Sequence, residues 1–195
     1  MKLTAIRHTR VAVPAGVCYG QTDVSLAESY KEELEQVKSV VANYSFDAVF
    51  CSPLKRCQLL AQDLFVPENI QLDQRLMELN FGAWEMQDWE TISRTAETQK
   101  WFDDFVEVRC ADGESFRDQI NRTALFLDEL RKQPHQQVAV VTHGGILRAL
   151  NCLLEGVAPH EAFQTKIDYG QVIDFTFDSS KLFQVSSCLN EFERD

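Results

Sequence analysis

Residues 138–145 read VAVVTHGG and contain the clearest strand of the chain. An apolar run follows two glutamines, which is typical of a strand covered on both faces in a parallel sheet. The two glycines then turn the chain into a segment with apolar residues at helical spacing, namely Ile146, Leu150, Leu153 and Leu154. A strand that leads directly into a helix predicts an α/β unit with His143 at the turn.

Other segments also have the apolar spacing of strands and helices. Residues 3–6 and 47–51 are short apolar runs typical of buried strands, and residues 114–132 have the spacing of a long helix. Residues 172–177 and 182–187 predict a β-hairpin near the C-terminus. The chain therefore predicts a mainly parallel sheet that is closed by a hairpin.

Two helix starts can be predicted from their first residues. Ser25 and Glu28 have the spacing of a capping box, in front of an apolar periodicity that ends near Asn43. Ser52 and Pro53 resemble an N-cap and the first residue of the next helix, where the missing amide of proline does no harm.

Strands that alternate with helices predict an α/β three-layer sandwich, with helices on both faces of the sheet. The chain shows no repeat, low-complexity tract or linker, so we expect a single domain over residues 1–195. Residues 76–112 are rich in Trp, Phe and Glu. We expect short helices over the sheet there, as a helical cap-like insertion.

Composition restricts the function classes. The chain has 195 residues and a formal net charge of −11, so it lacks the basic surface that nucleic-acid binding requires. No apolar run approaches the roughly 18 residues of a membrane-spanning helix. The six cysteines form no CxxC pair, which indicates reduced thiols and a cytoplasmic protein.

Reactive side chains follow the three strands. Arg7 and His8 follow the first, Arg56 lies shortly after the second, and His143 follows the third. Because ligands bind beyond the carboxyl ends of the strands in open α/β sheets, we expect these residues to share one pocket. Guanidinium groups match phosphate oxygens, and a helix start at Gly144 presents amides to an anion.

A neutral imidazole is also a competent nucleophile towards phosphorus near neutral pH. The leaving alcohol would then need a proton donor, for which a buried carboxylic acid is suited. Two histidines and a carboxylate could instead bind zinc or iron. However, no ligand pair has helical spacing and two arginines would repel a cation, so we expect no metal and no cofactor.

The motifs of this chain resemble those of the histidine phosphatase superfamily, which includes the cofactor-dependent phosphoglycerate mutases. The matching segments are residues 3–9 (LTAIRHT), 51–61 (CSPLKRCQLLA), 75–85 (RLMELNFGAWE), 113–115 (GES) and 140–149 (VVTHGGILRA). The resemblance implies the phosphoglycerate mutase-like fold, with His8 as the phosphorylated nucleophile. It also implies that Arg7, Arg56 and His143 hold the phosphoryl group, and that Glu78 is the general acid and base.

Residues 16–24 and 79–85 resemble those of the alpha-ribazole phosphatases, which act in cobalamin assembly, more than those of the glycolytic mutases. This resemblance implies that Gln21 and Thr22 contact the substrate at the mouth of the pocket. The family usually has glycine after the nucleophile, where this chain has Thr9. Thr9 therefore either donates its hydroxyl to the phosphate or narrows the site.

These features predict a metal-independent phosphomonoesterase with a phosphohistidine intermediate and a small phosphomonoester as substrate. Alpha-ribazole-5′-phosphate is the leading specific candidate. A phosphoglycerate mutase-type transferase, a broad-specificity sugar phosphatase and a phospho-ligand binding module without turnover are the alternatives. A homodimer is left open.

Overall fold

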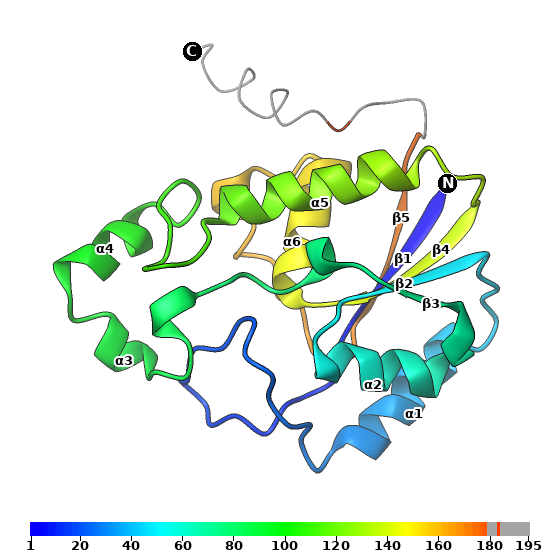
Figure 1. Cartoon of the computed structure of the whole chain (residues 1–195), viewed down its shortest axis with the longest axis horizontal. Helices are drawn as coiled ribbons and strands as arrows, with labels where there is room; N and C mark the ends of the chain where they lie inside the picture. The colour runs from blue at the N-terminus through cyan, green and yellow to red at the C-terminus, as the bar shows by residue number, and fades with distance from the viewer. Residues whose placement is uncertain (179–182, 184–195) are drawn as a thin grey trace.

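The computed structural model describes residues 1–178 and 183. Its sheet has the strand order β3-β2-β4-β1-β5, in which only β5 is antiparallel to its neighbour (Figure 1). The strands are β1 (Lys2–Arg7), β2 (Ala48–Cys51), β3 (Ile70–Leu72), β4 (Gln137–Thr142) and β5 (Val172–Thr176). Strand β4, which is buried from Val138 to Thr142, lies at the centre, as its apolar run predicts.

Helices cover both faces of the sheet, which confirms the three-layer α/β fold (Figure 1). The α-helices are α1 (Tyr30–Val41), α2 (Lys55–Leu64), α3 (Trp89–Ile92), α4 (Ala96–Asp103), α5 (Phe116–Leu130) and α6 (Gly144–Glu155). The short 3₁₀ helices are η1 (Pro67–Asn69), η2 (Gln74–Leu76), η3 (Gly82–Trp84) and η4 (Pro159–Glu161).

Two apolar clusters join the layers. One packs α1 and α2 against Ile6 and Val141, and the other packs α5 and α6 against Leu3 and Val140. Because the side chains of a strand alternate between the two faces, neighbouring residues of β1 and β4 serve both clusters. The sheet is thereby held between two helical layers, and the carboxyl ends of β1, β2 and β4 are left to carry polar residues.

The predicted capping box at Ser25 is wrong, because the helix begins at Tyr30. Backbone hydrogen bonds hold residues 25–27 beside the N-terminal loop: Ala12 N–H donates to Ser25 O, and Ala27 N–H donates to Arg10 O. A segment paired in this way cannot turn into a helix. Instead, the Ser29 hydroxyl donates to the Glu33 carboxylate at 2.7 Å.

The predicted N-cap at Ser52 is also wrong. The residue at the N-cap of α2 is Leu54, and the Ser52 hydroxyl lies beside His143. The sequence did not predict β3, a strand of only three residues at the sheet edge. The second strand of the predicted hairpin, residues 182–187, falls outside the described residues apart from Phe183.

Residues 76–112 contain η3, α3 and α4, so the short helices exist. In Figure 1, α3 and α4 lie to one side of the sheet and do not cover its faces. Trp84 and Trp101 are buried among Leu79, Ile92 and Cys110 in an apolar cluster of this segment. The segment therefore has its own packing, next to the end of the sheet where the strands finish.

Within residues 1–178, the structure contains no helix with the length and apolar character that crossing a membrane requires.

Candidate active site

The two histidines follow adjacent parallel strands. Arg7 of β1 is in register with Thr142 of β4, so His8 and His143 are the next residues on each strand. The His8 amide donates to the Thr142 carbonyl at 2.9 Å, and the two imidazole ring centroids lie 5.1 Å apart. Strand register alone thus brings these histidines together, as the sequence predicts.

The orientation of the His8 ring determines which nitrogen is nucleophilic. Its Nδ1 lies 2.7 Å from the Thr9 carbonyl oxygen. A carbonyl oxygen only accepts hydrogen bonds, so Nδ1 carries the proton and Nε2 carries the lone pair. Burial, with Arg56 and Arg7 nearby, lowers the His8 pKa well below its usual value. The ring is therefore neutral at physiological pH, which is the form in which an imidazole can act as a nucleophile.

His143 is fully buried at the N-cap of α6. Its Nε2 lies 2.7 Å from the Ser52 hydroxyl oxygen and 3.4 Å from the Cys57 sulfur. Burial lowers the His143 pKa well below its usual value, with further lowering by Arg56 and by His8. Both imidazoles of the site are therefore uncharged in the folded chain.

Arg7 and Arg56 approach from two sides, each held by main-chain carbonyls. The buried Arg56 donates from Nη1 to Thr22 O at 3.1 Å and from Nη2 to Gly20 O at 2.5 Å. Arg7 donates from Nη1 to Ile167 O at 2.5 Å, and its guanidinium lies 3.9 Å from the ring centroid of Tyr169. Neither guanidinium forms an ion pair with a carboxylate of the described residues.

The site contains buried donors that have no acceptor within the described residues. They are Arg7 Nε, Arg56 Nε, Arg148 Nε and the Thr9 hydroxyl. An unsatisfied buried polar atom costs about 1–3 kcal/mol, and more when it is charged. A bound oxyanion would supply acceptors to such donors, so the arrangement is suited to a phosphoryl group.

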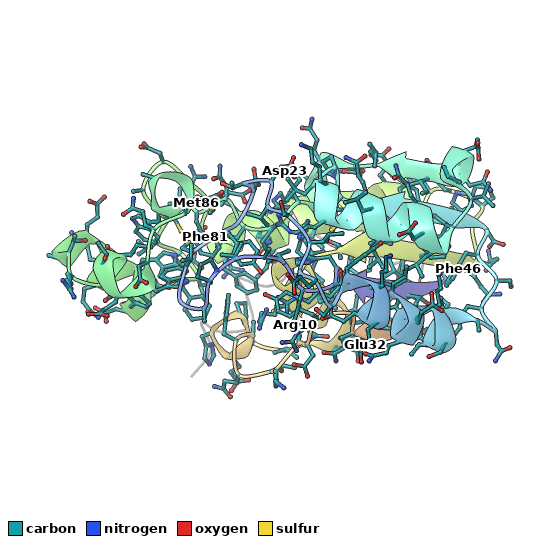
Figure 2. The ribbon with its side chains drawn as sticks, turned by 90° about the horizontal axis from the view of Figure 1, so that it is seen from below. Arg10, Asp23, Glu32, Phe46, Phe81 and Met86 are labelled. Atoms are coloured by element: carbon teal, nitrogen blue, oxygen red, sulfur yellow. The ribbon has the colours of Figure 1, made fainter. Side chains whose placement is uncertain are left out.

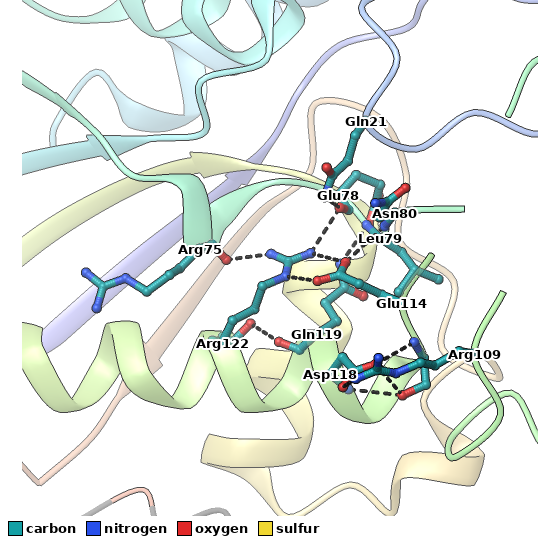
Figure 3. A network of polar contacts seen from close by, with 12 residues as sticks. Gln21, Arg75, Glu78, Leu79, Asn80, Arg109, Glu114, Asp118, Gln119 and Arg122 are labelled. Carbon is teal, nitrogen blue, oxygen red and sulfur yellow. Dashed lines mark hydrogen bonds and ion pairs between the residues drawn. The ribbon is translucent and has the colours of Figure 1, made fainter. Parts of the chain in front are cut away.

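Glu78 comes directly before Leu79, a member of the apolar cluster described above. Its carboxylate points to the start of α6. Its Oε1 accepts from the amides of Leu79 at 2.9 Å and Gly145 at 3.1 Å, and from Gln119 Nε2 at 3.1 Å. Figure 3 shows Arg122 beside it, donating to the Glu78 carbonyl at 3.0 Å and paired with Glu114. Helix α5 thus holds both the backbone and the carboxylate of Glu78.

The other predicted contact residues are Gln21, Thr22 and Gly144, and the structure gives each of them neighbours within the chain. The backbone amides of Gln21 and Thr22 donate to the Glu85 carboxylate at 2.8 and 2.6 Å, and Gln21 Nε2 donates to the Glu78 carbonyl at 3.0 Å. Gly144 lies close to Arg7, since a Cβ there would be 3.4 Å from the guanidinium carbon. The structure thus places Gly144 beside the guanidinium groups, and uses Gln21 and Thr22 to join the loop to Glu85.

A cavity of about 260 Å³ has Arg7, Glu78 and Arg148 in its lining. The remaining wall is largely aromatic and contains Tyr19, Phe81, Trp89, Phe163 and Tyr169. Figure 2 shows Phe46 near one end of the molecule and Phe81 well away from it. A larger groove of about 800 Å³, beside Phe46, contains none of the predicted site residues.

Several residues of the site had no sequence signal of their own. The Tyr19 and Tyr169 hydroxyls lie 2.6 Å apart, and their rings lie near Arg56 and Arg7. Gln119 is buried next to Glu78, although it lies on a helix predicted only from its apolar spacing. The position of this glutamine on the apolar face of the helix was the available signal, because a polar side chain that becomes buried needs a polar partner.

Known proteins similar to this chain include several phosphatases. Phosphoserine phosphatase 1 of Hydrogenobacter thermophilus is 31% identical over 163 residues, covering 80% of this chain and 77% of the relative. The adenosylcobalamin/alpha-ribazole phosphatase of Escherichia coli K12 is 29% identical over 178 residues, covering 87% of each chain. The fold matches the crystal structure of the alpha-ribazole phosphatase from Shigella flexneri with a TM-score of 0.83, at 24% identity and 91% coverage of each chain.

The family model that matches describes the histidine phosphatase superfamily (branch 1), and it spans residues 3–189. Because the match covers nearly the whole chain, the protein belongs to the histidine phosphatase superfamily.

Proposed function

We propose that the protein is a metal-independent phosphomonoesterase that acts through a phosphohistidine intermediate on His8. The observation that carries this proposal is the set of buried donors without acceptors around a neutral histidine: Arg7 Nε, Arg56 Nε and the Thr9 hydroxyl. A phosphate dianion satisfies all three. Phosphoryl transfer depends mainly on positioning and charge stabilisation, which this arrangement supplies.

The reaction has two steps. His8 Nε2 attacks phosphorus, the bond from phosphorus to the ester oxygen breaks, and Glu78 donates its proton to the leaving alcohol. Water then attacks the phosphohistidine while Glu78 accepts a proton from it, and the nitrogen–phosphorus bond breaks to release phosphate. Arg7, Arg56 and His143 stabilise the charge on the equatorial oxygens in both steps.

The remaining predicted residues assist binding. The Thr9 hydroxyl and the Gly144 amide donate to the phosphoryl oxygens, and the loop at Gln21 and Thr22 borders the leaving group. We further propose that residues 76–112 form a cap over the leaving-group cavity within a single domain. The thiols of Cys18, Cys51, Cys57 and Cys110 are free and buried, which supports a cytoplasmic location.

Alpha-ribazole-5′-phosphate is the substrate that we propose. The cavity wall supports it, because Phe81, Trp89 and Phe163 offer apolar faces to a planar base. The Escherichia coli relative is named as an adenosylcobalamin/alpha-ribazole phosphatase, which supports the same choice. This reaction would place the enzyme in cobalamin biosynthesis.

A phosphoester with a carboxylate, such as phosphoserine, is the second candidate, and Arg148 is the observation that favours it. Arg148 contributes to the cavity, its Nε is buried without an acceptor, and its guanidinium lies 4.8 Å from the Phe163 ring centroid. Burial lowers its pKa. A carboxylate on the leaving group would supply the missing acceptor, and the Hydrogenobacter relative is named as a phosphoserine phosphatase.

The experiment that tests the mechanism uses 4-nitrophenyl phosphate and the variant His8→Ala. We expect wild type to form an acid-labile phosphoenzyme and to keep its activity in EDTA, and His8→Ala to lose both the label and turnover. Full activity of His8→Ala would refute the proposal. Tight phosphate binding without labelling of wild type would instead indicate a binding module.

The experiment that tests the substrate compares kcat/KM for alpha-ribazole phosphate and phosphoserine in wild type, Trp89→Ala and Arg148→Ala. A ribazole phosphatase should prefer the first substrate and lose about 10-fold on Trp89→Ala, because one stacking contact is removed. A selective loss of phosphoserine turnover in Arg148→Ala would favour the second candidate. Transfer of the phosphoryl group to another hydroxyl, with little free phosphate, would indicate a mutase.

A further inference from the structure

Ser52 is a fully buried residue that joins the ends of two strands. Its amide donates to the Val141 carbonyl at 3.0 Å, next to the point where β4 leads into His143. Its side-chain oxygen lies 2.7 Å from His143 Nε2. This contact explains why Ser52 does not cap α2, since the hydroxyl is turned towards the histidine.

The surrounding hydrogen bonds assign the direction of this contact. The Leu54 amide donates to the Ser52 hydroxyl oxygen at 3.4 Å, and the Cys57 thiol donates to the Thr142 carbonyl at 3.4 Å. Cys57 therefore does not supply a proton to the ring. The Ser52 proton needs an acceptor, and the candidates beside it are His143 Nε2 and the sulfur of Cys57, which is a weak acceptor.

If His143 carried its proton on Nε2, Ser52 would accept two hydrogen bonds and leave its own proton to the sulfur. If Nε2 is unprotonated, the Ser52 proton bonds to it, and the Nδ1 proton is left for a bound oxyanion, with the Cys57 sulfur 3.8 Å away. An imidazole nitrogen is a stronger acceptor than a sulfur, so the second arrangement is preferred. A neutral ring has one proton, which then lies on Nδ1.

We propose that Ser52 is a positioning residue that holds neutral His143 as the Nδ1–H tautomer, so that the ring donates a hydrogen bond to the phosphoryl group. The tautomer follows from the hydrogen bonds alone, whereas its effect on turnover rests on the proposed phosphatase function. The same logic separates the two histidines. His8 is oriented by Thr9 to present a lone pair, and His143 is oriented by Ser52 to present a proton.

Protein labelled with ¹⁵N-histidine tests the tautomer directly. A long-range ¹H–¹⁵N correlation spectrum near neutral pH distinguishes protonated from unprotonated ring nitrogens, and His143→Asn assigns the His143 signals. We expect a protonated Nδ1 and an unprotonated Nε2 in wild type. A protonated Nε2 in wild type would overturn the proposal.

Ser52→Ala tests the role of the hydroxyl, with Cys57→Ala as the matched control, because Cys57 also touches His143 Nε2 but donates elsewhere. We expect Ser52→Ala to give a mixture of tautomers and a kcat for 4-nitrophenyl phosphate lowered about 10- to 100-fold, as for the loss of one charge-assisted hydrogen bond. Cys57→Ala should keep the wild-type tautomer. A purely structural role for Ser52 would lower the melting temperature and leave the tautomer unchanged, which would refute the proposal.

The outcomes separate this proposal from the proposed function. If the proposed function is wrong, His8→Ala keeps full activity. That result leaves the spectrum of His143 in the wild-type protein unchanged. An altered tautomer in Ser52→Ala with unchanged kcat would overturn the catalytic part of the inference alone.

Discussion

The change Gly145→Ala tests whether Glu78 must be held at its observed position. A Cβ at residue 145 would lie 2.2 Å from Glu78 Oε1 and 2.6 Å from Gln119 Oε1. Both are the ends of flexible side chains, so they move while the backbone stays. The carboxylate oxygen must shift by about 1 Å to reach ordinary contact, and a misplacement of that size can cost about 100-fold in rate.

Stability should not account for this loss. Residue 145 lies in the first turn of α6, and alanine is favoured over glycine in a helix by roughly 0.5–1 kcal/mol. That gain offsets part of the cost of moving Glu78 and Gln119. We therefore expect Gly145→Ala to fold with a melting temperature close to that of wild type, and to bind inorganic phosphate with similar affinity.

The assay compares an alkyl phosphate with 4-nitrophenyl phosphate. Nitrophenolate leaves without protonation, whereas an alkoxide needs the acid, whose contribution is about 100- to 10,000-fold. We expect Gly145→Ala to lower kcat at least 100-fold for the alkyl ester and much less for the aryl ester. The control Gly144→Ala, whose Cβ would meet Arg148 and Arg7 and not Glu78, should change both substrates alike.

A double-mutant cycle completes the test. If Gly145→Ala acts through Glu78, the double variant with Glu78→Gln should lose no more activity than Glu78→Gln alone. Multiplicative losses would refute the reasoning, as would an unchanged kcat for the alkyl ester in Gly145→Ala.

Three further outcomes are expected. The pKa values of His8 and His143 are lowered by burial and by the arginines, so both stay neutral when folded but protonate in the unfolded chain below about pH 6.5. The free energy of unfolding from urea titrations should therefore fall below that pH, less steeply in His143→Asn; an equal pH dependence would contradict this. Thr9→Val should weaken inhibition by phosphate about 3- to 10-fold without lowering stability, whereas Thr9→Ser should not. Glu85→Ala frees the amides of residues 21 and 22 and should raise KM about 10-fold in steady-state assays; an unchanged KM would argue against a role for this loop.

Much of the fold is encoded in local patterns. The apolar run of β4 and the helical spacing of α5 and α6 predicted these elements to within a few residues. The elements that were missed or wrongly predicted are short or depend on partners that are distant in the sequence. Strand β3 has three residues, too few for a pattern, and Ser25 is paired with a distant loop that a capping motif does not reveal.

The site likewise contains residues that could be predicted from the sequence and residues that could not. The residues that end the strands were predictable because parallel strands bring their carboxyl ends to one edge, which placed His8 beside His143. The groups that hold those residues were not predictable. Arg56 bonds to the carbonyls of Gly20 and Thr22, and Glu78 bonds to a glutamine on α5. These partners are far apart in the sequence, so a local pattern of residues does not reveal them.

The sequence by itself therefore determined the layer order, the family resemblance and the identity of the reactive side chains, since these follow from short-range spacing and residue chemistry. Only the tertiary structure decided which atom of each side chain faces the site. Ser52 illustrates this difference, because its hydroxyl could cap a helix in the sequence but bonds to His143 in the fold. The choice depends on the register of β2 against β4, which exists only once the sheet has formed.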